Sequence, residues 1–268
     1  MFLCALLMVV YGMLRPEHWV VYYNNALSPE SFQTFDLIVF DSDSHPPLAP
    51  LQDKKKTLLA YMSLGEVNSS RSYFKELQDK QFFIKENKQW GSWVVDVRRP
   101  EWTAYVNDTL IPAVLAQGFN GIMIDTVDSV TALEDGDPVT YVGMKQAAVH
   151  MIKDIHRRYP NLKIMINRGF DILPEVGGDV DMVLAESVYT DIPAGAKVPV
   201  VVADATYRDY IALLRGARKQ FPKLKVYTLD YWLPSDTHGV KRIYKAERRQ
   251  GFIPYVSTND LQNVYPEP

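Results

Sequence analysis

Eight short apolar runs recur along the chain with longer, helix-patterned segments between them, and this alternation limits the folds that the sequence can adopt. Runs rich in β-branched residues that alternate with helices are typical of βα units around a parallel sheet. Eight such units predict a (β/α)8 TIM barrel of the α/β class, in a single domain with short excursions. The expected strands are Trp19–Tyr23, Leu37–Phe40, Thr57–Ser63, Gly121–Asp125, Lys163–Asn167, Asp181–Glu186, Lys225–Asp230 and Phe252–Ser257.

Helix signals fall between these runs. Ser28, Pro29 and Glu30 are typical of a helix start, with a capping residue followed by proline in the first turn. A second helix is expected to begin at Pro100 and to end near Gly118. Apolar residues at helical spacing predict three more helices, over 144–155 before Pro160, 207–221 and 240–249.

Two further apolar runs, Trp93–Val97 and Val198–Val202, exceed the eight that a barrel needs. We interpret them as excursions from the barrel. If they were strands of the main sheet in place of two others, a doubly wound sheet would be the competing architecture. The chain shows no internal repeat and no low-complexity linker that would mark a second domain.

Residues 1–16 form a hydrophobic leader, and residues 17–268 are expected to form the barrel domain. The run from Met1 to Leu14 has the length of a signal-peptide core and is shorter than the roughly 20 residues that span a bilayer. We therefore expect an extracytoplasmic protein, periplasmic or secreted, with a possible membrane tether through the leader. The alternatives are a first buried strand, or a start codon assigned inside a longer signal.

Charge and cysteine content exclude several classes of protein. With 29 Lys and Arg against 32 Asp and Glu, the formal charge is −3, which argues against nucleic acid as a partner. Cys4 is the single cysteine, so an intramolecular disulfide and a cysteine zinc cage are both excluded. The sequence leaves the oligomeric state open.

Polar residues stand where each predicted strand ends. In a (β/α)8 barrel the active site is built at the carboxyl ends of the strands, so these residues would share one rim. A polar residue after a strand is ordinary turn chemistry when it occurs alone, but here the pattern recurs at all eight ends. The strand ends are Tyr23-Asn24, Asp41, Ser63 with Glu66, Asp125, Asn167-Arg168, Glu186, Asp230-Tyr231 and Ser257.

Asp125 and Glu186 are the candidate catalytic residues. Each ends an apolar strand, and two carboxyl groups in one crevice are what glycoside hydrolysis requires. Arg168 is expected near Asp125, where it would keep that carboxylate ionised, while desolvation would let Glu186 keep its proton. The alternative for either acid is a helix cap or a structural pair with an arginine.

Aromatic residues and the missing motifs narrow the chemistry further. Tyr23, Tyr61, Tyr189 and Tyr231 lie at or beside the rim, where amphipathic rings suit sugar faces. The five histidines form no HxH or HExxH pair, so no metal site is expected. The strand lysines stand at the ends opposite the expected active site, which argues against Schiff-base chemistry. GxGxxG, P-loop and GxSxG motifs are missing, and no cofactor is expected.

Five motifs together resemble glycoside hydrolase family 114 over nearly the whole chain after the leader. The family comprises (β/α)8 barrels with endo-α-1,4-polygalactosaminidase activity, and similar barrels form the hydrolase part of the Pel polysaccharide hydrolase/deacetylase. The segment from Tyr189 to Asp204 matches no pattern that we can place. The motifs are YMSLGE (61–66), WVVDVRRPEW (93–102), QGFNGIMIDTVDS (117–129), INRG (166–169) and LAES (184–187).

The resemblance implies roles for individual residues. Asp125 would be the nucleophile and Glu186 the acid/base of a retaining cycle that uses no metal and no organic cofactor. The rim positions Tyr23, Asp41 and Tyr231 are also candidate substrate-binding residues. The resemblance makes subsite residues of Tyr61, Ser63, Glu66, Asn167, Arg168, Tyr189 and Asp230.

The leading hypothesis is an exported endo-glycosidase whose partner is an amino-sugar polysaccharide. Its rival is a non-catalytic carbohydrate-binding barrel that serves as a scaffold in exopolysaccharide processing, and a third interpretation is a barrel that acts on a small non-sugar metabolite. If the polymer carries ammonium groups, an acidic rim would attract it, and its apparent affinity would fall with salt. The acids of that rim are Asp41, Asp43, Glu66, Asp125, Asp128, Glu186 and Asp230.

Overall fold

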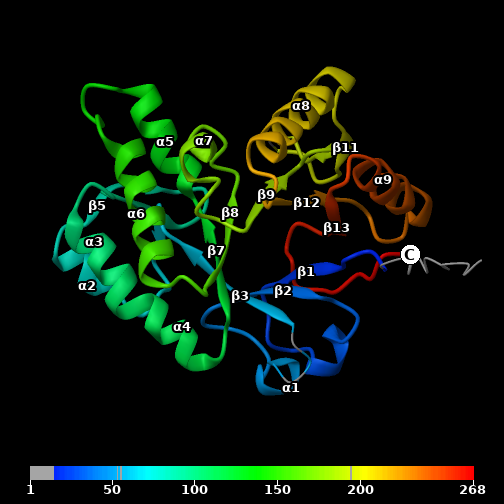
Figure 1. Cartoon of the computed structure of the whole chain (residues 1–268), viewed down its shortest axis with the longest axis horizontal. Helices are drawn as coiled ribbons and strands as arrows, with labels where there is room; N and C mark the ends of the chain where they lie inside the picture. Colours follow the sequence, from blue (N-terminus) through cyan, green and yellow to red (C-terminus); the bar gives the residue numbers. More distant parts are fainter. Residues whose placement is uncertain (1–14, 53, 55, 194) are drawn as a thin grey trace, which may run out of the picture.

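The computed structural model describes residues 15–268 except residues 53, 55 and 194, and its centre is an eight-stranded parallel sheet (Figure 1). Residues 1–14 of the predicted leader lie outside the described residues. All eight strands fall on predicted runs, with ends that differ by no more than one residue. They are β1 (Trp19–Tyr22), β2 (Leu37–Asp41), β3 (Thr57–Ser63), β7 (Gly121–Asp125), β8 (Lys163–Asn167), β9 (Met182–Glu186), β12 (Lys225–Tyr231) and β13 (Ile253–Ser257).

The strand order identifies a nearly closed (β/α)8 barrel. Neighbours follow one another in chain order from β1 to β13, and every pair is parallel. A doubly wound sheet would reverse its strand order at one point, so that alternative is wrong. The two outermost strands meet through side chains, because Trp19 of β1 packs edge-to-face on Tyr255 of β13 at 5.8 Å.

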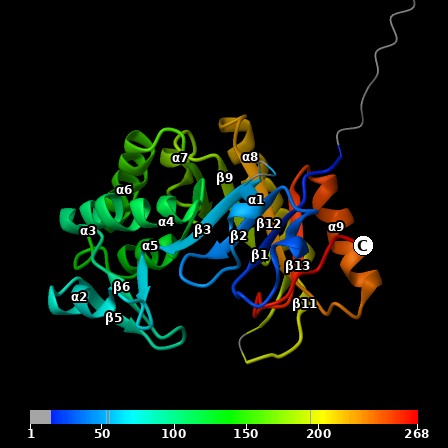
Figure 2. The ribbon, with the colours of Figure 1, turned by 90° about the horizontal axis from the view of Figure 1, so that it is seen from below.

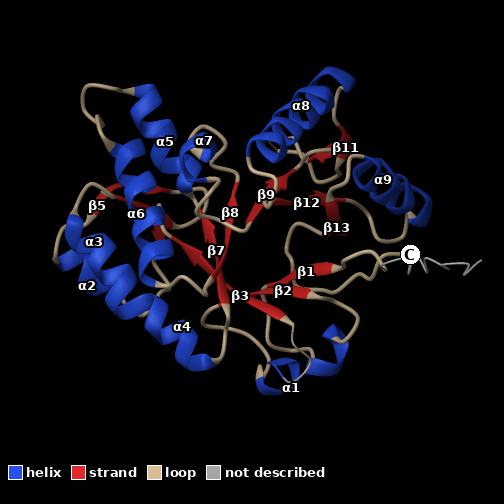
Figure 3. Cartoon of the chain, viewed as in Figure 1, coloured by secondary structure: helices blue, strands red, loops and turns tan. Residues whose placement is uncertain are grey.

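Helices surround the strands, and the longer ones lie where helical spacing predicts them (Figure 3). The predicted helix from Pro100 to Gly118 is interrupted by one π turn, η2 (Val106–Leu110). Gly118 ends it with φ of 106°, a left-handed conformation that favours glycine. The helices are η1 (Pro29–Phe32, 3-10), α1 (Ala49–Gln52), α2 (Phe74–Asp79), α3 (Pro100–Tyr105), α4 (Ile111–Gln117), α5 (Val127–Gly136), α6 (Met144–Arg158), α7 (Leu173–Val176), α8 (Asp204–Gln220) and α9 (Thr237–Arg249).

No helix within the described residues combines the length and the apolar character needed to cross a bilayer. Helix α5 was not expected from the sequence, because its apolar positions stand among polar and acidic residues.

The two extra apolar runs belong to excursions, as predicted. One forms a three-stranded antiparallel sheet from β4 (Glu66–Asn68), β5 (Phe83–Asn87) and β6 (Ser92–Val95). The other forms a hairpin from β10 (Thr190–Asp191) and β11 (Val200–Val201). The excursions follow β3 and β9, so both rise from the carboxyl ends of the barrel strands, and Figure 2 shows them on the same side of the molecule.

Strand register decides which residues face the barrel interior. Residues paired across neighbouring strands point to the same face, and alternate residues along a strand point to opposite faces. Trp19 and Tyr227 pack edge-to-face at 5.4 Å, and with Tyr255 they fill the interior beneath the carboxyl ends. By the same register, Asp125, Asn167, Glu186 and Tyr231 point inward above these rings.

Candidate active site

Three neighbouring strands end on the residues at the centre of the site. Asp125 ends β7, Asn167 ends β8 and Glu186 ends β9. The Nδ2 atom of Asn167 donates to Oδ1 of Asp125 at 2.8 Å and to Oε1 of Glu186 at 2.7 Å. The two carboxylate oxygens are therefore no further apart than the sum of these distances, about 5.5 Å. The sequence placed both acids at one rim, and the structure joins them through one amide.

Two tyrosine hydroxyls hold the other carboxylate oxygens. Tyr61 of β3 donates to Oδ2 of Asp125 at 2.8 Å, and Tyr231 of β12 donates to Oε2 of Glu186 at 3.0 Å. Burial, together with the neighbouring carboxylate, raises the pKa of both hydroxyls, so they stay protonated and act as donors. Tyr23 packs on the Tyr61 ring with centroids 5.0 Å apart, which fixes that donor in place.

Glu186 lies in surroundings that favour its protonated form. Burial is the main cause of its raised pKa, and the negative charge of Asp125 raises it further. The hydrogen bonds from Tyr231 and Asn167 act in the opposite direction, as does the charge of Arg168. A carboxyl group with a raised pKa keeps its proton to higher pH than a free glutamic acid does, which suits a group that delivers a proton to a leaving group.

The backbone turns in the same unusual way after each of the three strands. Thr126, Arg168 and Ser187 follow the three polar residues directly, and their φ angles are 65°, 56° and 57°. Residues with side chains rarely adopt this left-handed region, and such strain persists where surrounding contacts enforce it. The backbone directly after Asp125, Asn167 and Glu186 is thus held in one conformation, which restricts the positions of these three side chains.

Contacts around Thr126 show how one of these turns is fixed. Its Oγ1 accepts hydrogen bonds from the backbone N–H groups of Gly65 and Glu66, both at 3.0 Å. Gly65 approaches so closely that a Cβ atom there would stand 2.0 Å from the Thr126 carbonyl oxygen. The glycine of the YMSLGE motif is therefore required for the close approach of two strand ends.

Several predicted site residues lie beside the centre rather than in it. Asp41 forms a two-point ion pair with Arg71, at 3.0 and 2.7 Å, and the Arg71 guanidinium lies over the Tyr61 ring at 5.9 Å. Ser63 hydrogen bonds to the Glu66 carbonyl and to the Thr126 hydroxyl. No pattern in the sequence pointed to Arg71, because it comes from the excursion and not from a strand end.

The structure places Arg168 differently from the sequence interpretation. Its ion pair, at 3.4 Å, is with Asp128. The side chains that hydrogen bond to Asp125 are Tyr61 and Asn167, which are neutral donors. The carboxylate that pairs with Arg168 is thus that of Asp128 on helix α5, and Arg168 itself adopts a left-handed φ of 56°.

Two predicted subsite residues are buried behind the rim, and a third packs on helix α8. Glu66 is buried in β4, where it accepts hydrogen bonds from Asn87 and Ser92. Asp230 is fully buried and points outward from the barrel, because its neighbour Tyr231 points inward. Tyr189 packs edge-to-face on Tyr207 at 5.2 Å. The buried carboxyls of Glu66 and Asp230 therefore do not line the opening of the site.

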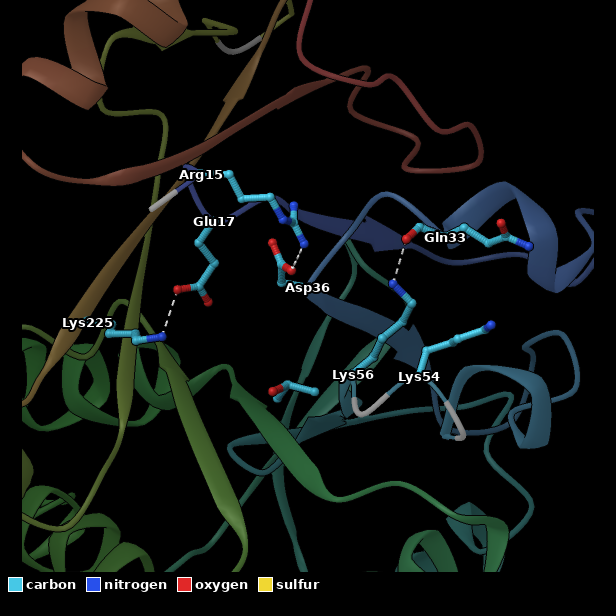
Figure 4. Close-up of a pocket in the computed structure, with 8 residues that line it drawn as sticks. Arg15, Glu17, Gln33, Asp36, Lys54, Lys56 and Lys225 are labelled. Atoms are coloured by element: carbon cyan, nitrogen blue, oxygen red, sulfur yellow. Dashed lines mark hydrogen bonds and ion pairs between the residues drawn. The ribbon is translucent and has the colours of Figure 1, made fainter. Parts of the chain in front are cut away.

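A cavity of about 690 Å³ lies at the opposite end of the barrel, where β1, β2, β3 and β12 begin (Figure 4). Its walls consist largely of residues that already pair with one another. Glu17 binds Lys225 at 2.7 Å, Arg15 pairs with Asp36, and Lys56 donates to the Gln33 carbonyl at 2.8 Å. Polar residues at this face of a barrel contribute to stability, whereas chemistry is carried out at the other face.

A smaller cavity of about 210 Å³ borders the Tyr61 side of the site, and Asp43 and Arg71 also line it. Within the part of the chain that the structure describes, no group of three His, Cys, Asp or Glu side chains could hold a metal ion.

Comparisons with known proteins agree with the fold. The sequence matches glycoside-hydrolase family GH114 over residues 12–267. The glycoside hydrolase domain of PelA from Pseudomonas aeruginosa has a similar structure, with 25% identity, a TM-score of 0.82 and coverage of 94% of this chain and 98% of that one. No curated protein matches the sequence.

Ega3 from Aspergillus fumigatus, solved in complex with galactosamine, shares the fold. It is 15% identical, with a TM-score of 0.69 and coverage of 94% of this chain and 95% of that one.

Proposed function

The chain belongs to glycoside hydrolase family GH114, and on that basis we propose that it cleaves an α-1,4-linked galactosamine-type polysaccharide by a retaining, two-carboxylate mechanism. One observation carries the mechanism: a single amide nitrogen of Asn167 bridges Asp125 and Glu186. Retaining glycosidases keep their carboxyl groups about 5–5.5 Å apart, whereas inverting enzymes need roughly 6.5–9.5 Å to admit a water molecule. The upper limit of about 5.5 Å between two oxygens here favours retention.

In the first step Asp125 attacks the anomeric carbon while Glu186 gives its proton to the departing glycosidic oxygen. The bond to the leaving sugar breaks, and a covalent glycosyl–aspartate ester forms. Tyr61 and Asn167 donate to the two oxygens of Asp125, so they orient the attacking carboxylate without adding a positive charge. The hydroxyl of Tyr231 holds Glu186 in place as the proton leaves.

In the second step water replaces Asp125 on the sugar, and Glu186 removes the proton from that water. The ester of the first step carries no charge, so the Asp125 charge that raises the pKa of Glu186 is then absent. Glu186 can lose its proton more readily at this stage, when the reaction needs a base. The same pair of residues thus supplies an acid and then a base.

The substrate class rests on the family and on two relatives. The PelA domain from Pseudomonas aeruginosa is a glycoside hydrolase, and Ega3 binds galactosamine in its crystal structure. Asp41, Asp43 and Asp128 are partly exposed acids around the site, and they would attract a polymer that carries ammonium groups. Glu66 and Asp230, also expected in this acidic rim, are buried and contribute little to it.

Incubation of the purified protein with a galactosamine polymer, followed by measurement of reducing ends, tests the proposal. Wild type should release reducing ends, and Asp125→Asn and Glu186→Gln should not. Asp108→Asn is a matched control and should behave as wild type. Asp108 lies on η2, where its carboxylate forms an exposed ion pair with Arg158. A wild type that binds amino-sugar polymers but cleaves none would favour the non-catalytic binding barrel, and equal activity in all variants would show that the residues were chosen wrongly.

We further propose that residues 1–16 direct export and that residues 17–268 act as one catalytic domain outside the cytoplasm. The apolar run and the polysaccharide substrate class support this proposal. Cell fractionation with N-terminal sequencing of the exported protein would test it, and recovery of the full chain in the cytoplasm alone would contradict it.

A further inference from the structure

Three buried polar side chains and the buried hydroxyl of a tyrosine lie outside the barrel, between β12 and the helices α8 and α9. Thr228 and Asp230 come from β12, Tyr207 from α8 and Glu247 from α9. Thr228, Asp230 and Glu247 are 0% exposed. Unpartnered among the described residues are Thr228 Oγ1, Asp230 Oδ2, the Tyr207 hydroxyl and both Glu247 oxygens. Buried polar groups without partners are rare because they destabilise the fold, so this cluster calls for an explanation.

The second oxygen of Asp230, Oδ1, holds the chain just after Glu186. It accepts hydrogen bonds from the backbone N–H groups of Tyr189 and Thr190, both at 2.8 Å, and from the Thr190 hydroxyl at 3.1 Å. The Thr190 hydroxyl oxygen also accepts from the Tyr231 backbone N–H at 3.1 Å. These bonds tie the segment that begins with the left-handed turn at Ser187 to strand β12.

Residues on both faces of strand β12 therefore constrain Glu186. Tyr231 points into the barrel and donates to the Glu186 carboxylate at 3.0 Å. Asp230 points out of the barrel and fixes the backbone three and four residues beyond Glu186. A side chain whose rotamer and backbone are both fixed keeps the narrow geometry that catalysis demands.

We propose that Asp230 is a positioning residue for Glu186, and that Asp230 and Glu247 share one proton, so that the pair carries a single negative charge. The proposal rests on the proposed function in so far as Glu186 is the acid/base. The charge remains on Asp230, where three donors surround Oδ1. The proton remains on Glu247, whose oxygens accept no hydrogen bond from a described residue.

Electrostatics support a shared proton. Neither carboxyl forms an ion pair with any residue that the structure describes. The ionisable group facing both of them is the hydroxyl of Tyr207, and the Thr228 hydroxyl also faces Glu247. Burial raises the pKa of both carboxyls, and the charge of Asp230 raises that of Glu247 further. Two unpaired charges in one buried layer would repel strongly, so the second ionisation is opposed.

Three variants test the proposal through kcat, KM and the pH profile of cleavage. In Asp230→Ala we expect kcat to fall about 10- to 100-fold with little change in KM, since a small misplacement of a catalytic group has this effect. Asp230→Asn keeps an acceptor oxygen and should recover part of the loss. Glu247→Gln keeps a donor and removes the titration, so it should retain kcat near pH 6. Asn107→Ala, at a buried polar residue on η2, is the structural control.

The pKa of Glu186 provides a readout that does not require turnover. Carboxyl-carbon NMR titration of Glu186 should give a lower pKa in Asp230→Ala than in wild type, because the freed turn lets water reach the carboxyl. Asn107→Ala should leave that pKa unchanged while lowering the melting temperature.

The outcomes distinguish the positioning role of Asp230 from the shared proton and from the proposed function. An unchanged pKa of Glu186 and an unchanged pH profile in Asp230→Ala, with only a loss of stability, would overturn the positioning role. A wild type that cleaves no amino-sugar polymer would refute the proposed function, while the NMR titration would still test whether Asp230 positions Glu186. Loss of activity in Glu247→Gln equal to that in Asp230→Ala would overturn the shared proton.

Discussion

The barrel carries two pairs of carboxyl groups on opposite faces of its wall, and the two pairs are held in different ways. Inside, Asp125 and Glu186 receive hydrogen bonds on all four oxygens from neutral donors. Outside, Asp230 is bonded through one oxygen, and Glu247 has no hydrogen-bond partner among the described residues. In the proposed mechanism the inner pair attacks the sugar and transfers a proton, whereas the outer pair is proposed to share one proton and to fix the backbone.

The role of each acid depends on which face of the barrel wall its side chain occupies. Asp230 and Tyr231 are neighbours in sequence, yet one faces the helices and the other faces the reacting centre. Strand alternation therefore assigns positioning to one residue and substrate-side chemistry to the next. Four changes test whether the two pairs differ in this way.

Removal of the inner acid should have the largest effect. In Glu186→Gln we expect kcat on polymer to fall about 10²- to 10⁴-fold, because general acid catalysis is lost. Activity on an aryl glycoside with a nitrophenolate leaving group should fall much less, since that group departs without a proton. Steady-state rates on both substrates provide the measurement. Equal losses on the two substrates would argue against an acid role for Glu186.

Removal of the bridging amide should have the next largest effect. Asn167→Ala takes away a hydrogen bond that lowers the pKa of Glu186, so that pKa should rise further. The basic limb of the kcat profile should then move to higher pH, with kcat reduced about 10- to 100-fold by the lost alignment. Asn68→Ala, on the excursion sheet, is a control in which the limb should stay in place. A basic limb that moves to lower pH would contradict the bridge.

The outer pair should control how stability depends on pH. The folded-state pKa of Glu247 is raised above its unfolded value, so its contribution to stability is complete at acid pH and is lost as the pH rises through the raised pKa. Each unit of that difference corresponds to about 1.4 kcal/mol. Glu247→Gln should flatten this loss in urea unfolding between pH 5 and 8, and Glu101→Gln, at an exposed carboxyl on α3, should not. A wild type whose free energy of unfolding rises from pH 5 to 8 would contradict a raised pKa for Glu247. So would a Glu247→Gln variant whose stability falls with pH as steeply as that of wild type.

Salt should produce the smallest effect. Raising NaCl from about 0.05 to 0.3 M should increase KM on a cationic polymer by about two- to five-fold and leave kcat unchanged, because exposed charges are screened. Asp43→Asn removes a carboxyl whose side chain is 55% exposed and should weaken the salt dependence. A KM that does not respond to salt would argue against electrostatic attraction of the substrate.

The sequence predicted much of the fold because periodicity reports backbone arrangement. Apolar β-branched runs located all eight barrel strands, and the same reasoning placed Asp125 and Glu186 at strand ends. Side-chain direction was harder to predict. Asp230 was expected at the rim because it ends an apolar run, but the strand continues through Tyr231, which faces inward instead.

Excursions and turns account for the other differences. Glu66 follows Ser63 closely in sequence, yet it begins a new strand, β4, that buries its carboxyl. Arg168 adopts a left-handed turn that directs it to Asp128. Such turns depend on contacts between distant segments, as between Gly65 and Thr126, which a local pattern does not contain.

The anomeric configuration of the first product distinguishes direct attack by Asp125 on the sugar from attack by water. Cleavage of an α-linked galactosamine polymer can be followed by proton NMR during the first minutes, before the new reducing end mutarotates. The spacing of Asp125 and Glu186 about one amide predicts that the α-anomer appears first. Initial appearance of the β-anomer would contradict a direct attack by Asp125 and would require a water molecule between the carboxyl groups.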